Sequence, residues 1–231
     1  MYRYPSPLIR GRFVRRYKRF LTEVELENGE IVTAHNTNTG SLKSCLLPGA
    51  PVLLQYHDNP KRKTRYTWES IRIGSTWVGV NTSVPNKLVL NAIRQGLLDD
   101  FRDFDRVRAE VTYGDSRLDL LLENDRRSMW VEIKNVTYRE GDYALFPDAP
   151  TERGRKHLLT LAKAVEEGYE AAMVYIIGRT DTRIFAPAKH IDPEYADLLR
   201  KVVEKGIKIL PYEVRYDEKG AQIIRKMPWE W

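Results

Sequence analysis

The chain has 231 residues, of which 42% are hydrophobic and 30% charged, enough for one large domain or two small ones with a proper core. Its longest apolar run, residues 171–177, is far shorter than the roughly 18 residues that a membrane helix needs, and the opening MYRYPSPL has no apolar signal core. The single cysteine, Cys45, excludes an intramolecular disulfide and fits a reducing compartment. We therefore expect a cytoplasmic protein with no membrane partner.

Positive charge is concentrated in the first third of the chain. Residues 1–84 contain 13 Lys and Arg against 6 Asp and Glu, a net charge of +7, which leaves 25 against 26, or −1, for residues 85–231. A basic surface attracts polyanions, and nucleic acid is the most abundant polyanion in a cytoplasm. This distribution predicts that the first third of the chain binds nucleic acid.

Short strands separated by Gly and Pro turns are expected throughout this basic part. Asn28-Gly29 is typical of a tight hairpin turn, and the polar stretch that begins at His35 separates the first strands from the later ones. Many short strands at close spacing favour a small barrel. The expected strands are 8–13, 20–26, 31–34, 51–56, 66–73 and 76–80, with a short helix at 41–46.

Two segments of this barrel combine basic and aromatic side chains. Proteins that bind single strands follow the phosphates with Lys and Arg and stack bases on exposed aromatic rings. Phe20 and Trp68 fit core packing as well as stacking, and a solvated rim is the plain alternative for the cations. The candidate nucleic-acid contacts are Arg15, Arg16, Tyr17, Lys18, Arg19, Lys61, Arg62, Lys63, Arg65 and Tyr66.

The second part of the chain alternates helices and strands. Residues 81–85 are expected to be a linker, and Pro85 to open a helix over 86–100, whose apolar residues recur at helical spacing. The continuous apolar run 171–177 predicts a strand buried on both faces. Further expected elements are a strand at 107–113, a loop at 138–150, a helix from Thr151, a helix at 192–204, a strand at 207–210 and a pair of strands at 212–216 and 221–226.

Acidic residues interrupt two apolar strands in the centre of this part, within SRLDLLLENDRRSMWVEIKNVT. Asp119 interrupts the first strand, and Glu132 and Lys134 interrupt the second, on one face because side chains alternate along a strand. A hairpin between the strands lets Asp119 face the same place. Buried carboxylates that converge are costly unless something compensates their charge.

A divalent cation would compensate these carboxylates. Oxygen ligands suit Mg²⁺ or Mn²⁺ rather than zinc, and the carbonyl of Ile133 and the carboxylate of Glu110 on the neighbouring strand are further candidate ligands. The plain alternative is an ion pair of Lys134 with the two carboxylates, and a half-exposed strand glutamate in the case of Glu110. The apolar setting favours the metal site.

The helix after this hairpin carries basic groups at three- and four-residue spacing. Arg153, Lys156 and His157 lie within reach of one another on such a helix. They are candidates for contacting phosphate, and His157 for positioning a water molecule. A basic solvated face is the alternative.

The pattern of Asp119 followed across a turn by Glu132-Ile133-Lys134 resembles the core of PD-(D/E)xK nucleases. The segments RRYKRFLTEV, HNTNTGSL, NPKRKTRYTWE, VNTSVPNKL and FPDAPTERGRKHL, in this order, resemble the sugar fermentation stimulation protein family. The resemblance implies an N-terminal OB-fold barrel over residues 1–84 and a nuclease-like α/β domain with a mixed central sheet over residues 85–231. It also implies DNA binding and places Arg153, Lys156 and His157 beside the catalytic hairpin.

Two functions are therefore expected, and a third is weaker. The first is a Mg²⁺- or Mn²⁺-dependent nuclease in which Asp119, Glu132, Lys134 and His157 are catalytic and DNA, single- or double-stranded, is the partner. The second is a DNA-binding regulator of sugar metabolism whose nuclease-like core does not cut. Saccharide binding by the barrel is the third, which the charge of +7 does not suit. A homodimer stays open.

Overall fold

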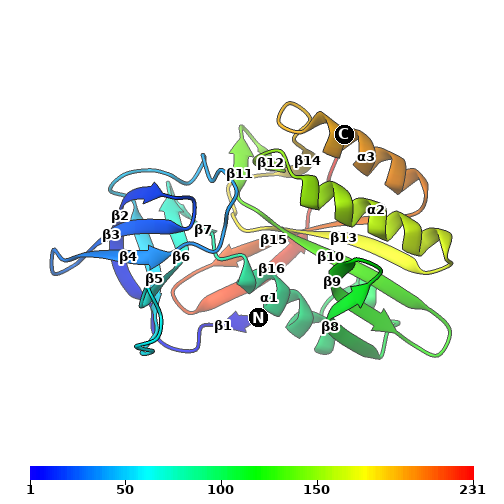
Figure 1. Cartoon of the computed structure of the whole chain (residues 1–231), viewed down its shortest axis with the longest axis horizontal. Coiled ribbons are helices and arrows are strands. Elements are labelled where there is room, and N and C mark those ends of the chain that lie inside the picture. Colours follow the sequence, from blue (N-terminus) through cyan, green and yellow to red (C-terminus); the bar gives the residue numbers. More distant parts are fainter.

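The computed structural model describes residues 1–231, which form a barrel and an α/β unit lying side by side (Figure 1). None of its helices combines the length and apolar character needed to cross a membrane.

The N-terminal unit is a closed five-stranded OB barrel. Its sheet has the order β4-β3-β2-β5-β6-β7, and β4 also pairs in parallel with β6, which closes the five strands β2 to β6 into the barrel and leaves β7 paired with β6 alone. Phe13 and Trp68 stack in its core with ring centroids 5.4 Å apart. The strands are β2 (Ile9–Tyr17), β3 (Leu21–Leu26), β4 (Ile31–His35), β5 (Pro51–Tyr56), β6 (Tyr66–Ile73) and β7 (Thr76–Gly79).

The structure corrects one expectation for the barrel and decides between the two alternatives of another. The helix expected at 41–46 is absent, and these residues form turns in which Leu42 has a φ of 51°, outside the helical region. Leu42 is instead buried in the barrel core, so tertiary packing overrides any local helical tendency. Of the two ambiguous aromatic residues, Trp68 is in the core, whereas Phe20 is 46% exposed.

The C-terminal unit contains a mixed seven-stranded sheet of order β1-β16-β15-β13-β10-β9-β8. Helix α1 packs on one face, and α2 and α3 on the other (Figure 1). The buried run 171–177 is the central strand β13, as expected. The elements are β1 (Tyr2–Arg3), α1 (Ser83–Arg94), β8 (Arg106–Tyr113), β9 (Ser116–Glu123), β10 (Ser128–Val136), α2 (Glu152–Glu166), β13 (Glu170–Ile177), α3 (Pro193–Glu204), β15 (Lys208–Tyr216) and β16 (Gly220–Lys226).

Alternating apolar and polar residues place the two core clusters on either side of this sheet. Val131 and Ile133 of β10 pack with Leu88 of α1 in one cluster, whereas Trp130 lies with Leu158 of α2 in the other. Glu132 and Lys134 follow Trp130 at spacing of two and therefore share the α2 face.

The segment expected to be the loop 138–150 forms part of a small second sheet. β11 (Tyr138–Glu140) and β12 (Tyr143–Phe146) make a hairpin, and β12 pairs in parallel with β14 (Ile184–Pro187). These strands have only three or four residues, too short for an alternation to show in the sequence. Their pairing with β14 joins segments about forty residues apart, which local sequence patterns do not reveal.

The boundary between the two units differs in detail from residues 84 and 85. Helix α1 begins at Ser83 and ends at Arg94, short of the expected 100, before Gly96 with a φ of 64° and the 3₁₀ turn Asp99–Phe101. At the other end, Tyr2 and Arg3 pair with Ala221 and Gly220, so the chain starts in the sheet of the C-terminal unit before entering the barrel.

The strands expected at 207–210 and 212–216 are one strand, β15.

Candidate functional site

The site begins where β9 and β10 separate. Their antiparallel pairing runs from Ser128 opposite Glu123 to Val131 opposite Leu120 and stops there, although β10 continues along β13 to Val136. At this point the Oδ2 atom of Asp119 accepts a hydrogen bond of 2.7 Å from the backbone N–H of Ile133. The side chain of Asp119 thus takes the place of the missing backbone partner.

The buried Glu132 and His157 and the half-buried Lys134 form a compact group beside this opening. Lys134 Nζ lies 2.5 Å from Glu132 Oε1, and His157 Nδ1 also hydrogen-bonds that oxygen. Lys134 Nζ and His157 Nδ1 are 3.3 Å apart. Because Nδ1 donates only when protonated and accepts only when it is not, the proton on His157 decides whether it bonds to Glu132 or to Lys134.

The two carboxylates of the site have opposite pKa shifts. Burial raises the pKa of Glu132, but Lys134 and His157 lower it by more, so the pKa lies below its usual value. Burial, together with the negative charge of Glu132, raises the pKa of Asp119 to about 6. No Lys, Arg or His pairs directly with Asp119, so the charge of its carboxylate is not compensated by a salt bridge.

Asn86, on α1, is a site residue that the sequence did not indicate. Its Nδ2 atom donates a hydrogen bond of 2.7 Å to Asp119 Oδ1, so both carboxylate oxygens of Asp119 are held, one by α1 and one by β10. An asparagine in the first turn of a helix is common, and only the packing of α1 on the sheet shows what it faces. The site therefore joins α1, the β9–β10 hairpin and α2.

The residues present fit a divalent cation held by two carboxylates. Glu132 Oε2 is buried without a hydrogen-bond partner, which is unusual for a charged oxygen and leaves it free to coordinate. Mg²⁺ keeps several waters and needs only one or two protein carboxylates, so Asp119 and Glu132 suffice. No group of three His, Cys, Asp or Glu side chains gathers as a ready-made cage.

Glu110 is not brought into this site, in contrast to the expectation that it adds a metal ligand. Its carboxylate is largely exposed and lies 3.7 Å from Arg117 on the adjacent strand. Glu110 has a φ of 54°, an uncommon conformation that interrupts the regular alternation of β8 at this point. The strand that carries it is next to β9, as expected, but the side chain pairs elsewhere.

The three candidate residues of α2 lie on different sides of the helix. His157 is buried against the sheet, whereas Arg153 and Lys156 are exposed. Lys156 Nζ contacts the carbonyl oxygen and the carboxylate of Asp115 at 3.1 and 3.0 Å. His157 therefore faces the sheet, whereas Arg153 and Lys156 face solvent.

The first basic segment of the barrel contains one residue that is committed to the fold. Arg16 donates to the carbonyl oxygens of Arg19, Asn38, Gly40 and Ser41, which occupies its guanidinium and contradicts its expected role in contacting phosphate. Arg15 pairs with Glu23 at 2.6 Å and lies over the Tyr17 ring.

The remaining candidates of the barrel are on its surface. Lys18 and Arg19 are exposed in the β2–β3 turn, and so are the cations of the loop between β5 and β6. Arg62 donates to Thr64 and Thr67, and Arg65 to the Tyr56 hydroxyl. Tyr66 packs edge to face on Tyr56. The other exposed members of this loop are Lys61 and Lys63.

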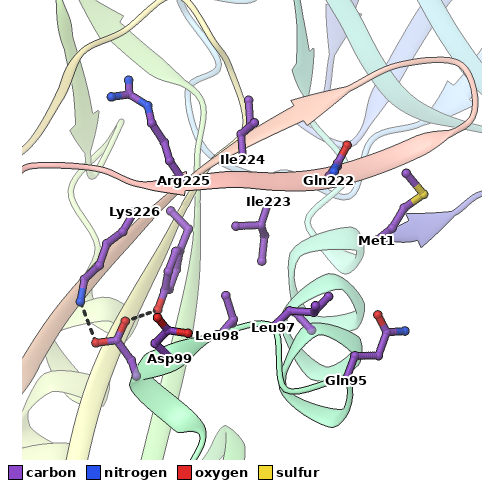
Figure 2. A pocket seen from close by; sticks show the side chains of 13 residues that line it. Met1, Gln95, Leu97, Leu98, Asp99, Gln222, Ile223, Ile224, Arg225 and Lys226 are labelled. Carbon is purple, nitrogen blue, oxygen red and sulfur yellow. Dashed lines mark hydrogen bonds and ion pairs between the residues drawn. The ribbon is translucent and has the colours of Figure 1, made fainter.

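A surface hollow of about 510 Å³ lies away from this site, between the end of α1 and β16 (Figure 2). Leu97, Leu98 and Ile223 line it, and Asp100 at its edge accepts from Tyr212 and Lys226. None of Asp119, Glu132, Lys134 or His157 is among its lining residues. The hollow is therefore a separate feature from the candidate site.

Together, the fold and the site define a class of protein in which an OB barrel precedes an α/β domain whose mixed sheet carries two carboxylates and a lysine side by side. Residues 14–80 match the family model described as the SfsA N-terminal OB domain, and residues 83–220 match the sugar fermentation stimulation protein RE domain. The chain belongs to the sugar fermentation stimulation protein family.

Relatives along the whole length support this assignment. The homolog from Geotalea uraniireducens is 46% identical over 224 residues, which cover 96% of this chain and 97% of that protein. The homolog from Marinomonas sp. is 46% identical over 230 residues, covering 98% and 89%. Among solved structures, that of Pyrococcus furiosus SfsA in complex with Ca²⁺ matches with a TM-score of 0.91 at 29% identity, covering 100% of this chain and 98% of that one.

Proposed function

We propose that this protein is a divalent-metal-dependent nuclease that binds DNA through its barrel and hydrolyses phosphodiester bonds at the opening between β9 and β10. The observation that carries the proposal is the group formed by the buried Glu132 and the partly buried Asp119 and Lys134, in which the Oε2 atom of Glu132 has no partner. Two carboxylates and an amine at this spacing are an expensive arrangement for a protein interior unless they act on a ligand.

Asp119 and Glu132 would hold the cation, Mg²⁺ or Mn²⁺. When bound, such a cation lowers the pKa of a water molecule and neutralises charge on the phosphate. The family relative whose structure was determined with Ca²⁺ supports a divalent cation with oxygen ligands in this chain. The carbonyl of Ile133 stays a proposed additional ligand.

Lys134 provides the positive charge that the protein, in addition to a bound cation, brings to the site. Its side chain is 14% exposed, and its ammonium is held in position by Glu132. A fixed ammonium stabilises the negative charge that develops on a phosphate during hydrolysis. His157, bonded to the same Glu132 oxygen, orients both groups from α2.

The second candidate function is DNA binding without cleavage, in a regulator. Its specific support is that Asp119 is already held by Asn86 and by the N–H of Ile133, which gives it a structural role without metal. Both candidates share the same partner, DNA, whose phosphates suit the net charge of +7 on residues 1–84. A homodimer and a cytoplasmic location remain proposals.

Cleavage of radiolabelled DNA in Mg²⁺ or Mn²⁺ tests the first candidate. We expect the wild type to cut and the variants Asp119→Ala and Lys134→Ala to lose at least about 100-fold in rate, because the first removes a ligand of the cation and the second removes the ammonium that stabilises charge on the phosphate. Both variants should still shift DNA in a gel, which shows that they are folded and bind.

The exposed residues Asp125 and Lys163 provide matched controls. Asp125→Ala and Lys163→Ala change the same charges outside the site and should cleave as the wild type does. If the wild type yields no product while retaining DNA, the regulator is correct. If Asp119→Ala cuts as fast as the wild type, the proposed site is wrong.

A further inference from the structure

The turn between β2 and β3 has an unusual backbone. Lys18 and Arg19 are consecutive residues other than glycine with positive φ angles, 49° and 61°. Such conformations are unfavourable for residues other than glycine, so they persist only where the surroundings enforce them. The turn is therefore held in one shape rather than left to solvent.

Neighbouring groups supply this enforcement. The carbonyl of Arg19 accepts from Arg16 Nε at 2.7 Å and from Asn36 Nδ2 at 3.1 Å, and the carbonyl of Phe20 accepts from the N–H of Asn36 at 2.8 Å. Arg16 donates in addition to the carbonyl of Asn38 at 2.8 Å. The guanidinium that is unavailable for phosphate thus fixes the shape of the turn.

The turn exposes one aromatic side chain and two basic side chains. Phe20 is 46% exposed, and Lys18 and Arg19 beside it are exposed as well. The segment from Arg12 to Thr22 contains five basic residues and no acidic one. An aromatic ring held rigidly among cations is the arrangement that pairs base stacking with phosphate attraction in proteins that bind single strands.

The segment that supports the turn also reaches both helices of the candidate site. Thr37 bonds to Asn81 and Thr82 at the start of α1, which carries Asn86. The N–H of Leu42 bonds to Asp148 at 2.9 Å, shortly before α2, which carries His157. Residues 36–42 therefore connect the Phe20 turn to the elements that build the site, as the loop crossing between the two units in Figure 1 also shows.

We propose that Phe20 stacks on an unpaired nucleobase, with Lys18 and Arg19 on the adjacent phosphates, so that the substrate is a nucleic acid with single-stranded bases. Bases inside a duplex already stack on both neighbours, so only an unpaired base offers a face to the ring. The inference rests on the proposed function, because it takes nucleic acid as the ligand.

Binding measured in EDTA, where cleavage is absent, tests this site. Fluorescence anisotropy of a labelled thymidine homopolymer and of a blunt duplex of equal length is compared for the wild type and Phe20→Ala. We expect the variant to bind the homopolymer about 5- to 150-fold more weakly, the effect of one lost stacking contact, and the duplex within about twofold of the wild type. Phe20→Tyr keeps the ring and should bind as the wild type does.

Salt dependence separates the ring from the cations. Phe20→Ala should leave the slope of log affinity against log salt unchanged, whereas Lys18→Gln should reduce its magnitude by about 0.7, the value for one phosphate contact on a single strand. Ile31→Ala removes another exposed apolar side chain of the barrel, 55% exposed, and should change neither quantity.

Two results would overturn the inference: Phe20→Ala binding the homopolymer as well as Ile31→Ala does, or equal losses for homopolymer and duplex. These outcomes leave the nuclease proposal standing if the wild type cuts DNA. Conversely, a wild type that binds the homopolymer through Phe20 but never cuts refutes only the nuclease.

Discussion

Asp119 illustrates how a single residue can be both structural and chemical. One carboxylate oxygen replaces a backbone acceptor in the β9–β10 ladder, and the other accepts from Asn86. The carboxylate is thereby oriented while burial raises its pKa to about 6. Neither neighbour carries a charge, so orientation and charge compensation come from different sources. A cation would supply the compensation.

Replacing Asn86 separates these two contributions. In Asn86→Ala, Asp119 keeps its bond to β10 but loses the one to α1, so we expect Mn²⁺ affinity to fall by about 10- to 100-fold, the usual effect of losing a residue that orients a metal ligand. Isothermal titration calorimetry with Mn²⁺ measures this directly.

Asn91 is the matched control for Asn86, since it is an asparagine on the same helix whose side chain has no bond to the site. Asn91→Ala should bind Mn²⁺ as the wild type does. Equal affinities for Asn86→Ala and the wild type would show that Asp119 does not need α1, or that the ion binds elsewhere.

Among the elements, the two-residue strand β1 can pair only because its neighbour has a glycine at the point of contact. It extends the C-terminal sheet beyond β16, and it does so next to Gly220. A Cβ atom at position 220 would lie 1.9 Å from the carbonyl oxygen of Tyr2, closer than any non-bonded contact permits. The absence of a side chain at this position is therefore a condition for β1 to pair.

Gly220→Ala should displace β1 from the sheet. We expect a loss of about 1–3 kcal/mol in the free energy of unfolding, as for other substitutions that overfill a packed position, measured by denaturant titration. Removal of residues 1–4 should cost a similar amount, and Gly220→Ala in that shortened chain should cost little more, because both changes remove the same contact. Additive losses would contradict this explanation.

The sequence predicted the long elements well and the short ones poorly. The alternation of the barrel strands and the apolar run of β13 are local signals, and these strands lie close to where they were expected, except that β2 continues to Tyr17, beyond the expected end at residue 13. The strands β1, β11, β12 and β14 consist of two to four residues, too short for an alternation to show, and β1 and β14 pair with strands that are distant in the chain. The missing helix at 41–46 has the same cause, because Leu42 is positioned by the barrel core.

The candidate site was predictable where strand alternation determines it. Glu132 and Lys134 had to share a face of β10, and the structure joins them. His157 required knowledge of how α2 lies on the sheet, which the family resemblance supplied, and Asn86 required the position of α1, which nothing in the sequence gave. The role of Arg16 was misjudged because its four acceptors are backbone carbonyls, which no residue type reveals.

At the scale of the whole molecule, the two units meet around a buried carboxyl group. Glu69 of β6 is 4% exposed, and both its oxygens accept from Asn81 Nδ2 at 2.9 Å. The hydroxyls of Tyr4 and Tyr216, from the N-terminal arm and β15, are buried nearby without partners. Barrel, arm and sheet therefore share one polar cluster, and its protonation affects how firmly they hold together.

Burial raises the pKa of Glu69 from 4.5 to about 7, against the opposing effects of Asn81 and Lys87. The folded chain thus keeps a proton up to about pH 7 that the unfolded chain releases near pH 4.5, so this group stabilises the fold at low pH and the contribution is lost as the pH rises through 7. In Glu69→Gln that loss is absent. Between about pH 4.5 and 8 the wild type should lose on the order of 3 kcal/mol relative to this variant, measured by denaturant titration in EDTA. Glu27→Gln, at an exposed position of the barrel, should follow the wild type at every pH, and parallel profiles for wild type and Glu69→Gln would mean that the carboxyl group is not protonated in the folded chain.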